Sequence, residues 1–222
     1  MATITGKFPS GFAETIIGTP EDDTIFPLGG YDLVDGGAGV DTVVVAANLS
    51  QFTINRSGGL VYVDTVSAAS GGGDQLRVKN VERLSFTDAK VAIDTAINQS
   101  AGEALLLTAA VLGRTAAMGN KALMGVGIAL FDQGMSMLDL SAAVMRLPIW
   151  DTLASGNSPN QIATYLLTVV NGKAPSAGEL DAAVRSLNAD PQGTLLSQLA
   201  LSTLNQLQAD LVGVQKAGLV FE

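Results

Sequence analysis

Three consecutive nine-residue repeats in residues 18–44 constrain the fold of this chain more than any other feature. They read GTPEDDTIF, PLGGYDLVD and GGAGVDTVV. Aspartate holds the sixth place of each repeat (Asp23, Asp32, Asp41), and an apolar residue holds the eighth (Ile25, Val34, Val43). This nonapeptide pattern is typical of a parallel β-helix, in which a glycine-containing turn leads into a short strand whose middle side chain fills the core. The alternative is that three Asx turns recur by chance in a glycine-rich loop.

The acidic residues of this region have no basic neighbours in sequence, because residues 8–55 contain seven carboxylates and neither Lys nor Arg. Two repeats make one coil, so repeats 1 and 3 are expected to stack on the same side. Asp23 and Asp41, with turn carbonyls, can then supply the roughly 6–8 oxygens that Ca²⁺ prefers. We expect those carbonyls to come from the first and third places of each turn: Gly18, Pro20, Gly36 and Ala38. The chain has no Cys and no His, so only oxygen ligands remain, and these favour Ca²⁺ or Mg²⁺.

A fourth repeat is expected at residues 69–77, ASGGGDQLR, with Asp74 sixth and Leu76 eighth. It predicts Asp74 as the same-side neighbour of Asp32, and these two residues as the centre of a second Ca²⁺ site. The alternative is that GGGD is only the turn before a strand. Glu21, Asp22 and Asp35 lie outside the sixth place, and we expect them to be solvated carboxylates.

The composition changes near residue 95, which predicts two domains. Residues 1–95 are rich in Gly, Asp, Val and Thr, with alternating runs such as LVYVDTV at 60–66 that are typical of strands. Residues 96–222 are rich in Ala and Leu with helical spacing. The fold class is therefore expected to be α+β: a short calcium-binding parallel β-roll with additional strands, followed by an all-α domain of about six helices.

The helical half has repeated start signals. Capping-box spacing joins Ser100 to Glu103, Ser136 to Asp139, Ser158 to Gln161 and Ser176 to Glu179. Helices are predicted near 100–112, 119–133, 136–146, 158–170, 176–188 and 190–209. LLTAAVLGRTAA at 106–117 is similar to LLTVVNGKAPSA at 166–177, so this half is either an internal duplication or a chance likeness in Leu/Ala-rich sequence.

The net charge of −9 and the sequence pI of about 4.4 argue against a nucleic-acid partner, which would need clustered Lys and Arg. The longest apolar run, ALLLTAAVLG, is too short to span a membrane, and MATITGKFPSGF has no apolar segment of a cleavable N-terminal signal. The sequence has no G-x-S-x-G, P-loop or complete dinucleotide-binding motif, so we expect a protein that is not an enzyme.

The repeats at 18–44 resemble the calcium-binding RTX repeats of proteins exported by bacterial type I secretion. DQLRVKNVERLSFTDAKVAID at 74–94 is similar to the segment that often closes such a block, and the helical half is similar to a helical domain of unknown function that often follows it. The resemblance implies an extracellular protein, exported unfolded through a C-terminal secretion signal and folded on external Ca²⁺. Repeat 2 departs from the pattern at Pro27 and Leu28, and repeat 1 at Glu21.

The expected function is that of a secreted calcium-binding structural or adhesive protein that associates with itself at the cell surface or in extracellular matrix. The alternative is a binding module for surface polysaccharide or another secreted protein. Five methionines (Met118, Met124, Met135, Met137 and Met145) lie close together with several glycines. They are either ordinary core side chains or an adaptable surface for self-association.

Overall fold

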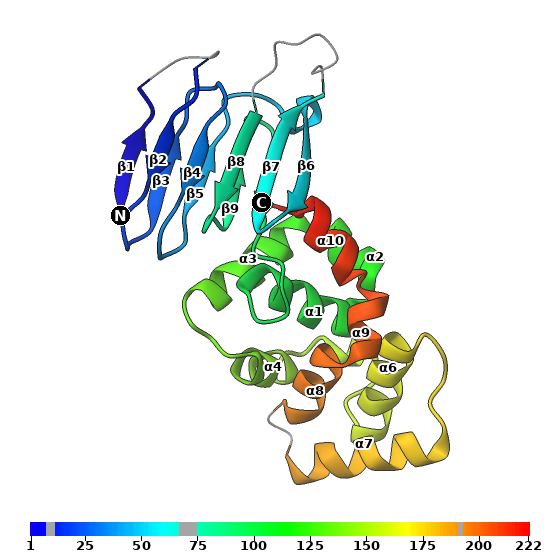
Figure 1. The fold of residues 1–222 in the computed structure, drawn as a ribbon. Helices are drawn as coiled ribbons and strands as arrows, with labels where there is room; N and C mark the ends of the chain where they lie inside the picture. Colours follow the sequence, from blue (N-terminus) through cyan, green and yellow to red (C-terminus); the bar gives the residue numbers. More distant parts are fainter. Residues whose placement is uncertain (8–11, 67–74, 191–192) are drawn as a thin grey trace. The chain divides into compact units, whose positions relative to one another are not determined.

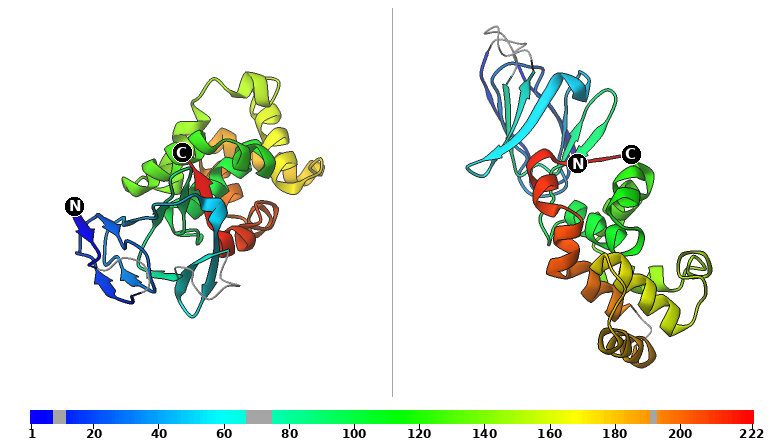
Figure 2. Two further views of the ribbon diagram at one scale, coloured as in Figure 1. Left: turned by 90° about the horizontal axis from the view of Figure 1, so that it is seen from above. Right: turned by 90° about the vertical axis from the view of Figure 1, so that its right-hand side faces the viewer.

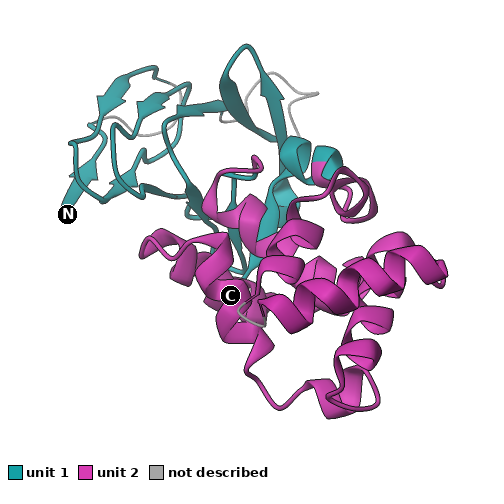
Figure 3. Ribbon diagram, turned by 90° about the horizontal axis from the view of Figure 1, so that it is seen from below, with its two compact units in different colours: residues 1–95, 212–222 teal, residues 96–211 magenta. Residues whose placement is uncertain are grey.

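The computed structural model describes residues 1–7, 12–66, 75–190 and 193–222 (Figure 1). These residues form eleven β-strands in two sheets and ten α-helices, so the predicted mixture of helices and strands is confirmed. They divide into unit 1 (residues 1–95 and 212–222) and unit 2 (residues 96–211), coloured separately in Figure 3. Residues 212–222, which the sequence analysis assigned to the helical domain, belong instead to unit 1.

Unit 1 contains both sheets. Sheet A has the strand order β1-β3-β5-β9-β10-β11, and sheet B has the order β2-β4-β8-β7-β6. The strands are β1 (Ala2–Thr5), β2 (Thr15–Ile17), β3 (Asp23–Phe26), β4 (Leu33–Asp35), β5 (Thr42–Val44), β6 (Phe52–Ser57), β7 (Leu60–Thr65), β8 (Gln75–Lys79), β9 (Arg83–Ser85), β10 (Lys90–Ala92) and β11 (Leu219–Phe221). A 3-10 turn at Leu49–Gln51 leads into β6.

The first five strands alternate between the two sheets. In sheet A, β1, β3, β5 and β9 pair in parallel, and in sheet B, β2, β4 and β8 do the same. The sheets face one another across a common core (Figure 2). Because the connections at 18–22, 27–32 and 36–41 are short, the residues of repeats 1 and 3 lie on neighbouring strands, with Thr24 opposite Thr42.

The core of unit 1 takes one apolar side chain from the middle of each short strand. Ile25, Val34 and Val43 have no exposed surface, so the prediction that the eighth place of each repeat fills the core is confirmed. Leu84 of β9 is opposite Val43 and is equally buried. Burying one side chain of this size contributes about 1.5–3 kcal/mol, which compensates for strands of only three or four residues.

The remaining strands extend both sheets in the antiparallel sense. In sheet B, β6 and β7 form a hairpin through Gly58 and Gly59, and β7 pairs with β8. In sheet A, β10 pairs with β9 on one side and with β11 on the other. All of unit 2 is therefore inserted in the chain between two adjacent strands.

Unit 2 is helical. Its helices are α1 (Ser100–Leu112), α2 (Arg114–Gly119), α3 (Lys121–Asp132), α4 (Met137–Met145), α5 (Trp150–Leu153), α6 (Pro159–Asn171), α7 (Ala177–Ala189), α8 (Thr194–Leu201) and α9 (Thr203–Gln208). A tenth helix, α10 (Leu211–Ala217), begins at its last residue and continues into unit 1. Helix α1 buries nine of its residues, including Leu105 and Leu106, which have no exposed surface.

The helix count of about six was wrong, because α8 and α9 divide the helix predicted at 190–209, and α2, α5 and α10 were not predicted. Asn120 separates α2 from α3 and accepts a hydrogen bond from the Leu123 N–H. Ser202 has extended backbone angles and separates α8 from α9. Neither residue is Gly or Pro, so the sequence carried no strong stop signal.

The predicted caps are mostly present. Ser158 and Ser176 form capping boxes with Gln161 and Glu179, and the Ser136 side chain accepts a hydrogen bond from the Asp139 N–H. Ser100 is not a cap, since α1 begins one residue earlier with Gln99 at the N-cap. Over the described ranges, no helix is both long and apolar enough to cross a membrane.

Candidate functional site

Five carboxylates of unit 1 share one structural position, two residues before the buried apolar residue of a strand. They are Asp23, Asp41 and Glu82 along sheet A, and Glu14 and Asp32 along sheet B. We call this set the carboxylate ladder. The structure therefore brings Asp23 and Asp41 onto neighbouring strands, as the repeat phase predicts, and adds Glu82 on the next one.

Each step of the ladder is a hydrogen bond from a main-chain N–H to the carboxylate at the same place on the neighbouring strand of the sheet. Along sheet A, the Ala2 N–H donates to Asp23 Oδ1, the Asp23 N–H to Asp41 Oδ1 and the Asp41 N–H to Glu82 Oε2, each at 2.8 Å. Along sheet B, the Glu14 N–H donates to Asp32 Oδ1 at 3.0 Å. The acidic residues thus link neighbouring strands of each sheet through hydrogen bonds to carboxylate oxygens.

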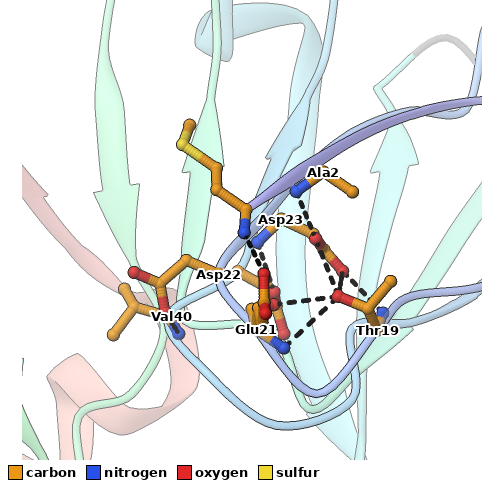
Figure 4. Close-up of polar contacts among 8 residues, drawn as sticks. Ala2, Thr19, Glu21, Asp22, Asp23 and Val40 are labelled. Atoms are coloured by element: carbon orange, nitrogen blue, oxygen red, sulfur yellow. Dashed lines mark hydrogen bonds and ion pairs between the residues drawn. The ribbon is translucent and has the colours of Figure 1, made fainter.

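The Asp23 carboxylate is fully satisfied by protein donors (Figure 4). Besides Ala2, it accepts the Thr19 N–H at 2.6 Å on Oδ2 and the Thr19 hydroxyl at 2.9 Å on the same oxygen. These bonds, led by the one from the Thr19 main chain, lower the pKa of Asp23 below its ordinary value. Asp23 is buried as an anion that already has its partners.

The Asp41 carboxylate is different. It has no exposed surface, and its Oδ2 has no hydrogen-bond partner among the described residues. Gly37 stands where repeat 1 has Thr19, so no hydroxyl reaches this oxygen, and the Gly37 N–H bonds Asp35 instead. Burial raises the pKa of Asp41 above its ordinary value, and the nearby Asp23 and Asp22 act in the same direction. Such an oxygen calls for a proton or a cation.

The predicted turn residues Gly18 and Gly36 lie close to the Oδ2 atoms of Asp23 and Asp41, respectively. A Cβ on Gly36 would lie 2.5 Å from Asp41 Oδ2 and closer still to the Asn80 carbonyl oxygen. A Cβ on Gly18 would lie 3.0 Å from Asp23 Oδ2 and closer to the Gly36 carbonyl oxygen. Each glycine thus lets a carboxylate oxygen and a carbonyl oxygen converge beside its Cα, an arrangement we call a cradle, and at Gly36 the carboxylate oxygen is the unpartnered one. This set fits a hard cation.

The other predicted ligands are less central. Pro20 and Ala38 lie exposed at bends of their turns. Asp32 is buried and bonds the Glu14 main chain. Asp74 lies outside the described residues. The register of β8 places Val78 opposite Val34, where the predicted fourth repeat would have placed Leu76. That repeat is therefore out of phase by two residues.

The three acids expected to be solvated divide into two kinds. Glu21 is largely exposed, as expected. Asp22 is exposed as well, although one of its oxygens has a main-chain partner, whereas Asp35 is only partly exposed and forms an ion pair. Asp22 Oδ1 accepts the Val40 N–H at 2.8 Å, and Asp35 pairs with Lys79 at 2.7 Å. The pKa of Asp35 is lowered, chiefly by its hydrogen bond from Lys79.

Sequence reasoning missed Glu82. It lies at the sixth place in the register of sheet A, but the turn before it has only Asn80 and Val81, so the period of nine is broken. The sequence signal that could have identified Glu82 is its place two residues before Leu84, the same spacing that separates the aspartate from the apolar residue in each repeat. Burial raises the pKa of Glu82 to about 7, with the adjacent Asp41 carboxylate contributing.

Within the described part of the chain, no three His, Cys, Asp or Glu side chains converge on one metal position. A cation at the turns would therefore need main-chain carbonyls and water in addition to carboxylates. No protein-family model matches the chain, and no curated protein matches it either.

Proposed function

We propose that the coils built from the repeats form a short calcium-binding β-roll, and that Ca²⁺ binds at its turns with Asp41 as a ligand. The observation that carries the proposal is the buried, unpartnered Asp41 Oδ2 beside the cradle at Gly36. A bound cation would neutralise a carboxylate that is otherwise costly to bury. The alternation of parallel strands between two facing sheets further supports the β-roll.

The number of protein ligands suggests modest affinity. With few carboxylates and the rest of the shell made of carbonyls and water, a dissociation constant of about 10⁻⁴–10⁻³ M is expected, the range of extracellular calcium modules. Such a site is empty where free Ca²⁺ is low and filled outside the cell. We therefore propose a secreted protein whose unit 1 is stabilised by external Ca²⁺.

We further propose a structural or adhesive role in which the protein associates with itself at the cell surface or in matrix. Met124 and Met137 are buried in the core of unit 2, and Met118, Met135 and Met145 are half-buried, so the five methionines do not form an exposed surface. The exposed apolar side chains of α3 are Leu123 and Val126, at 40% and 57% exposure. These residues lie one turn apart on the helix and are better candidates for a contact surface.

The alternative role, a polysaccharide-binding module, lacks an aromatic platform in unit 2. Trp150 is buried and packs edge-on against Tyr165, with ring centroids 6.4 Å apart. The Tyr165 hydroxyl donates to the Val111 carbonyl at 2.9 Å. Neither ring is free to stack on a sugar.

Calorimetric titration with CaCl₂ tests the proposed site. Asp41→Asn should abolish or strongly weaken binding, while Asp181→Asn, on the exposed face of α7, should leave it unchanged. Light scattering across the same Ca²⁺ series, on the wild type and on Val126→Lys, tests self-association. Absence of Ca²⁺ binding by the wild type would refute the calcium proposal, and a monomer at every Ca²⁺ concentration would refute self-association.

A further inference from the structure

The sequence pattern places the cation site between repeats 1 and 3. The cradle with the unpartnered oxygen, however, lies between repeat 3 and the segment 80–82 that follows it in sheet A. Gly36 faces the segment 80–82, which is not part of any repeat: the Gly36 N–H donates to the Lys79 carbonyl at 3.1 Å, and the Asn80 carbonyl oxygen lies beside the position of the missing Cβ. Asp41 Oδ2 borders the same space.

The segment 80–82 also carries a carboxylate, that of Glu82, which binds the main chain of Asp41. Glu82 accepts the Asp41 N–H through Oε2, so the two acidic residues are one ladder step apart. Their basic neighbours are engaged elsewhere, since Arg83 pairs with the buried Asp94 and Lys79 pairs with Asp35. The fully buried Asp41 carboxylate and Glu82 are therefore one ladder step apart, and Arg83, the basic side chain that acts electrostatically on Glu82, pairs with Asp94.

The equivalent space one step earlier is filled by protein. There the oxygen is Asp23 Oδ2, and the Thr19 main chain and hydroxyl already donate to it. A cation in that space would have to displace two short hydrogen bonds. In the space at Gly36 it would displace none, because Gly37 offers no hydroxyl and Asp41 Oδ2 is unpartnered.

We propose that Asp41, the Asn80 carbonyl and Glu82 form the cation site, so that the ion lies between repeat 3 and the closing segment 80–82. This inference rests on the proposed calcium function and specifies which coils share the ion. The chemistry is that of a hard divalent cation held by two carboxylates, a main-chain carbonyl and water. The closing segment, and not the pair of repeats 1 and 3, then completes the site.

The test is calorimetric titration of the full chain with CaCl₂, comparing Glu82→Gln with Glu14→Gln. Glutamine keeps an oxygen that can accept the same main-chain N–H, so the ladder is preserved. Glu14 is the matched control, since its carboxylate accepts the Lys7 N–H in sheet B, away from the Gly36 space. Glu82→Gln should weaken Ca²⁺ binding by about tenfold or more, and Glu14→Gln should leave it unchanged.

The outcomes separate this inference from the proposed function. Wild-type affinity in Glu82→Gln, together with lost binding in Asp41→Asn, would overturn the shared site with segment 80–82 and leave the calcium function intact. Loss in Asp23→Asn equal to that in Asp41→Asn, with none in Glu82→Gln, would place the ion between repeats 1 and 3. Failure of the wild type to bind would refute the calcium function itself. Urea unfolding of each variant verifies that it is folded at the titration conditions.

Discussion

Replacing Asp41 by asparagine should have opposite effects on stability with and without Ca²⁺. The substitution is isosteric, and the asparagine oxygen can still accept the Asp23 N–H at the position of Oδ1. What changes is the second atom, which becomes a neutral amide group at the place of the unpartnered Oδ2. In a chelator, the variant should therefore be more stable than the wild type.

The magnitude follows from two terms. Removing a buried unsatisfied charged oxygen is worth about 2–3 kcal/mol, and losing the charge assistance of the retained hydrogen bond costs about 1 kcal/mol. The net gain is about 1–2 kcal/mol. With a urea slope of about 2 kcal/mol per molar, typical of a small protein, the midpoint of unit 1 should rise by roughly 0.5–1 M.

In Ca²⁺ the order should reverse. At a concentration of about 100 times the dissociation constant, binding stabilises the wild type by about 2.7 kcal/mol, and the variant gains little or none of this. Asp23→Asn is the informative control, because both of its oxygens accept main-chain N–H groups and an amide NH₂ would face one of them. That variant should be less stable than the wild type in both conditions.

Urea unfolding followed by far-UV circular dichroism, in EDTA and in CaCl₂, measures all three proteins. The reasoning is refuted if Asp41→Asn is less stable than the wild type in EDTA, since Asp41 Oδ2 would then have a stabilising partner. A variant that gains as much stability from Ca²⁺ as the wild type would show that Asp41 is not a ligand.

Three further predictions use other parts of the structure. Gly36→Ala should destabilise unit 1 and abolish Ca²⁺ binding, because its Cβ would collide with two oxygens, whereas Gly178→Ala, with nothing within 4 Å, should be neutral or stabilising in urea. The pKa of Glu82 is raised from 4.5 to about 7, so in EDTA the protonated Glu82 should add to the free energy of unfolding below pH 4.5, and this contribution should be lost as the pH rises through 7. The urea midpoint of Glu82→Gln should not show this pH dependence. Met124→Lys should strongly lower the melting temperature of unit 2, because Met124 is buried. Val126→Lys, at an exposed position, should leave the melting temperature within a few degrees of the wild type.

The repeat pattern predicted the elements that obey it and failed where the turn length changes. Ile25, Val34 and Val43 lie in the core and Asp23 lies next to Asp41 because nine residues separate equivalent places. To join the carboxylate ladder, a strand needs only a carboxylate two residues before its buried apolar residue. The length of the turn that precedes this carboxylate can therefore vary.

The closing segment uses that freedom. Its turn, Asn80 and Val81, is three residues shorter than the turn of repeat 3, so a search with period nine passes over Glu82. The same strict period led to Leu76 at a core place that Val78 occupies. The distinction between Asp23 and Asp41 could not be predicted either, since it depends on the hydroxyl that Thr19 provides and Gly37 lacks.

The pairing of β10 with β11 has a consequence for how the protein is made. Ala92 is opposite Leu219, so a ribosome that has finished β10 must still synthesise all of unit 2 before its partner strand emerges. During that interval the outer edge of β10 presents unpaired main-chain groups, which can pair with strands of other nascent chains. Once residue 219 has been synthesised, fast folding of unit 2 would shorten the further time that β11 needs to reach this edge. A helical insert between two sheet strands can thus protect its host during translation.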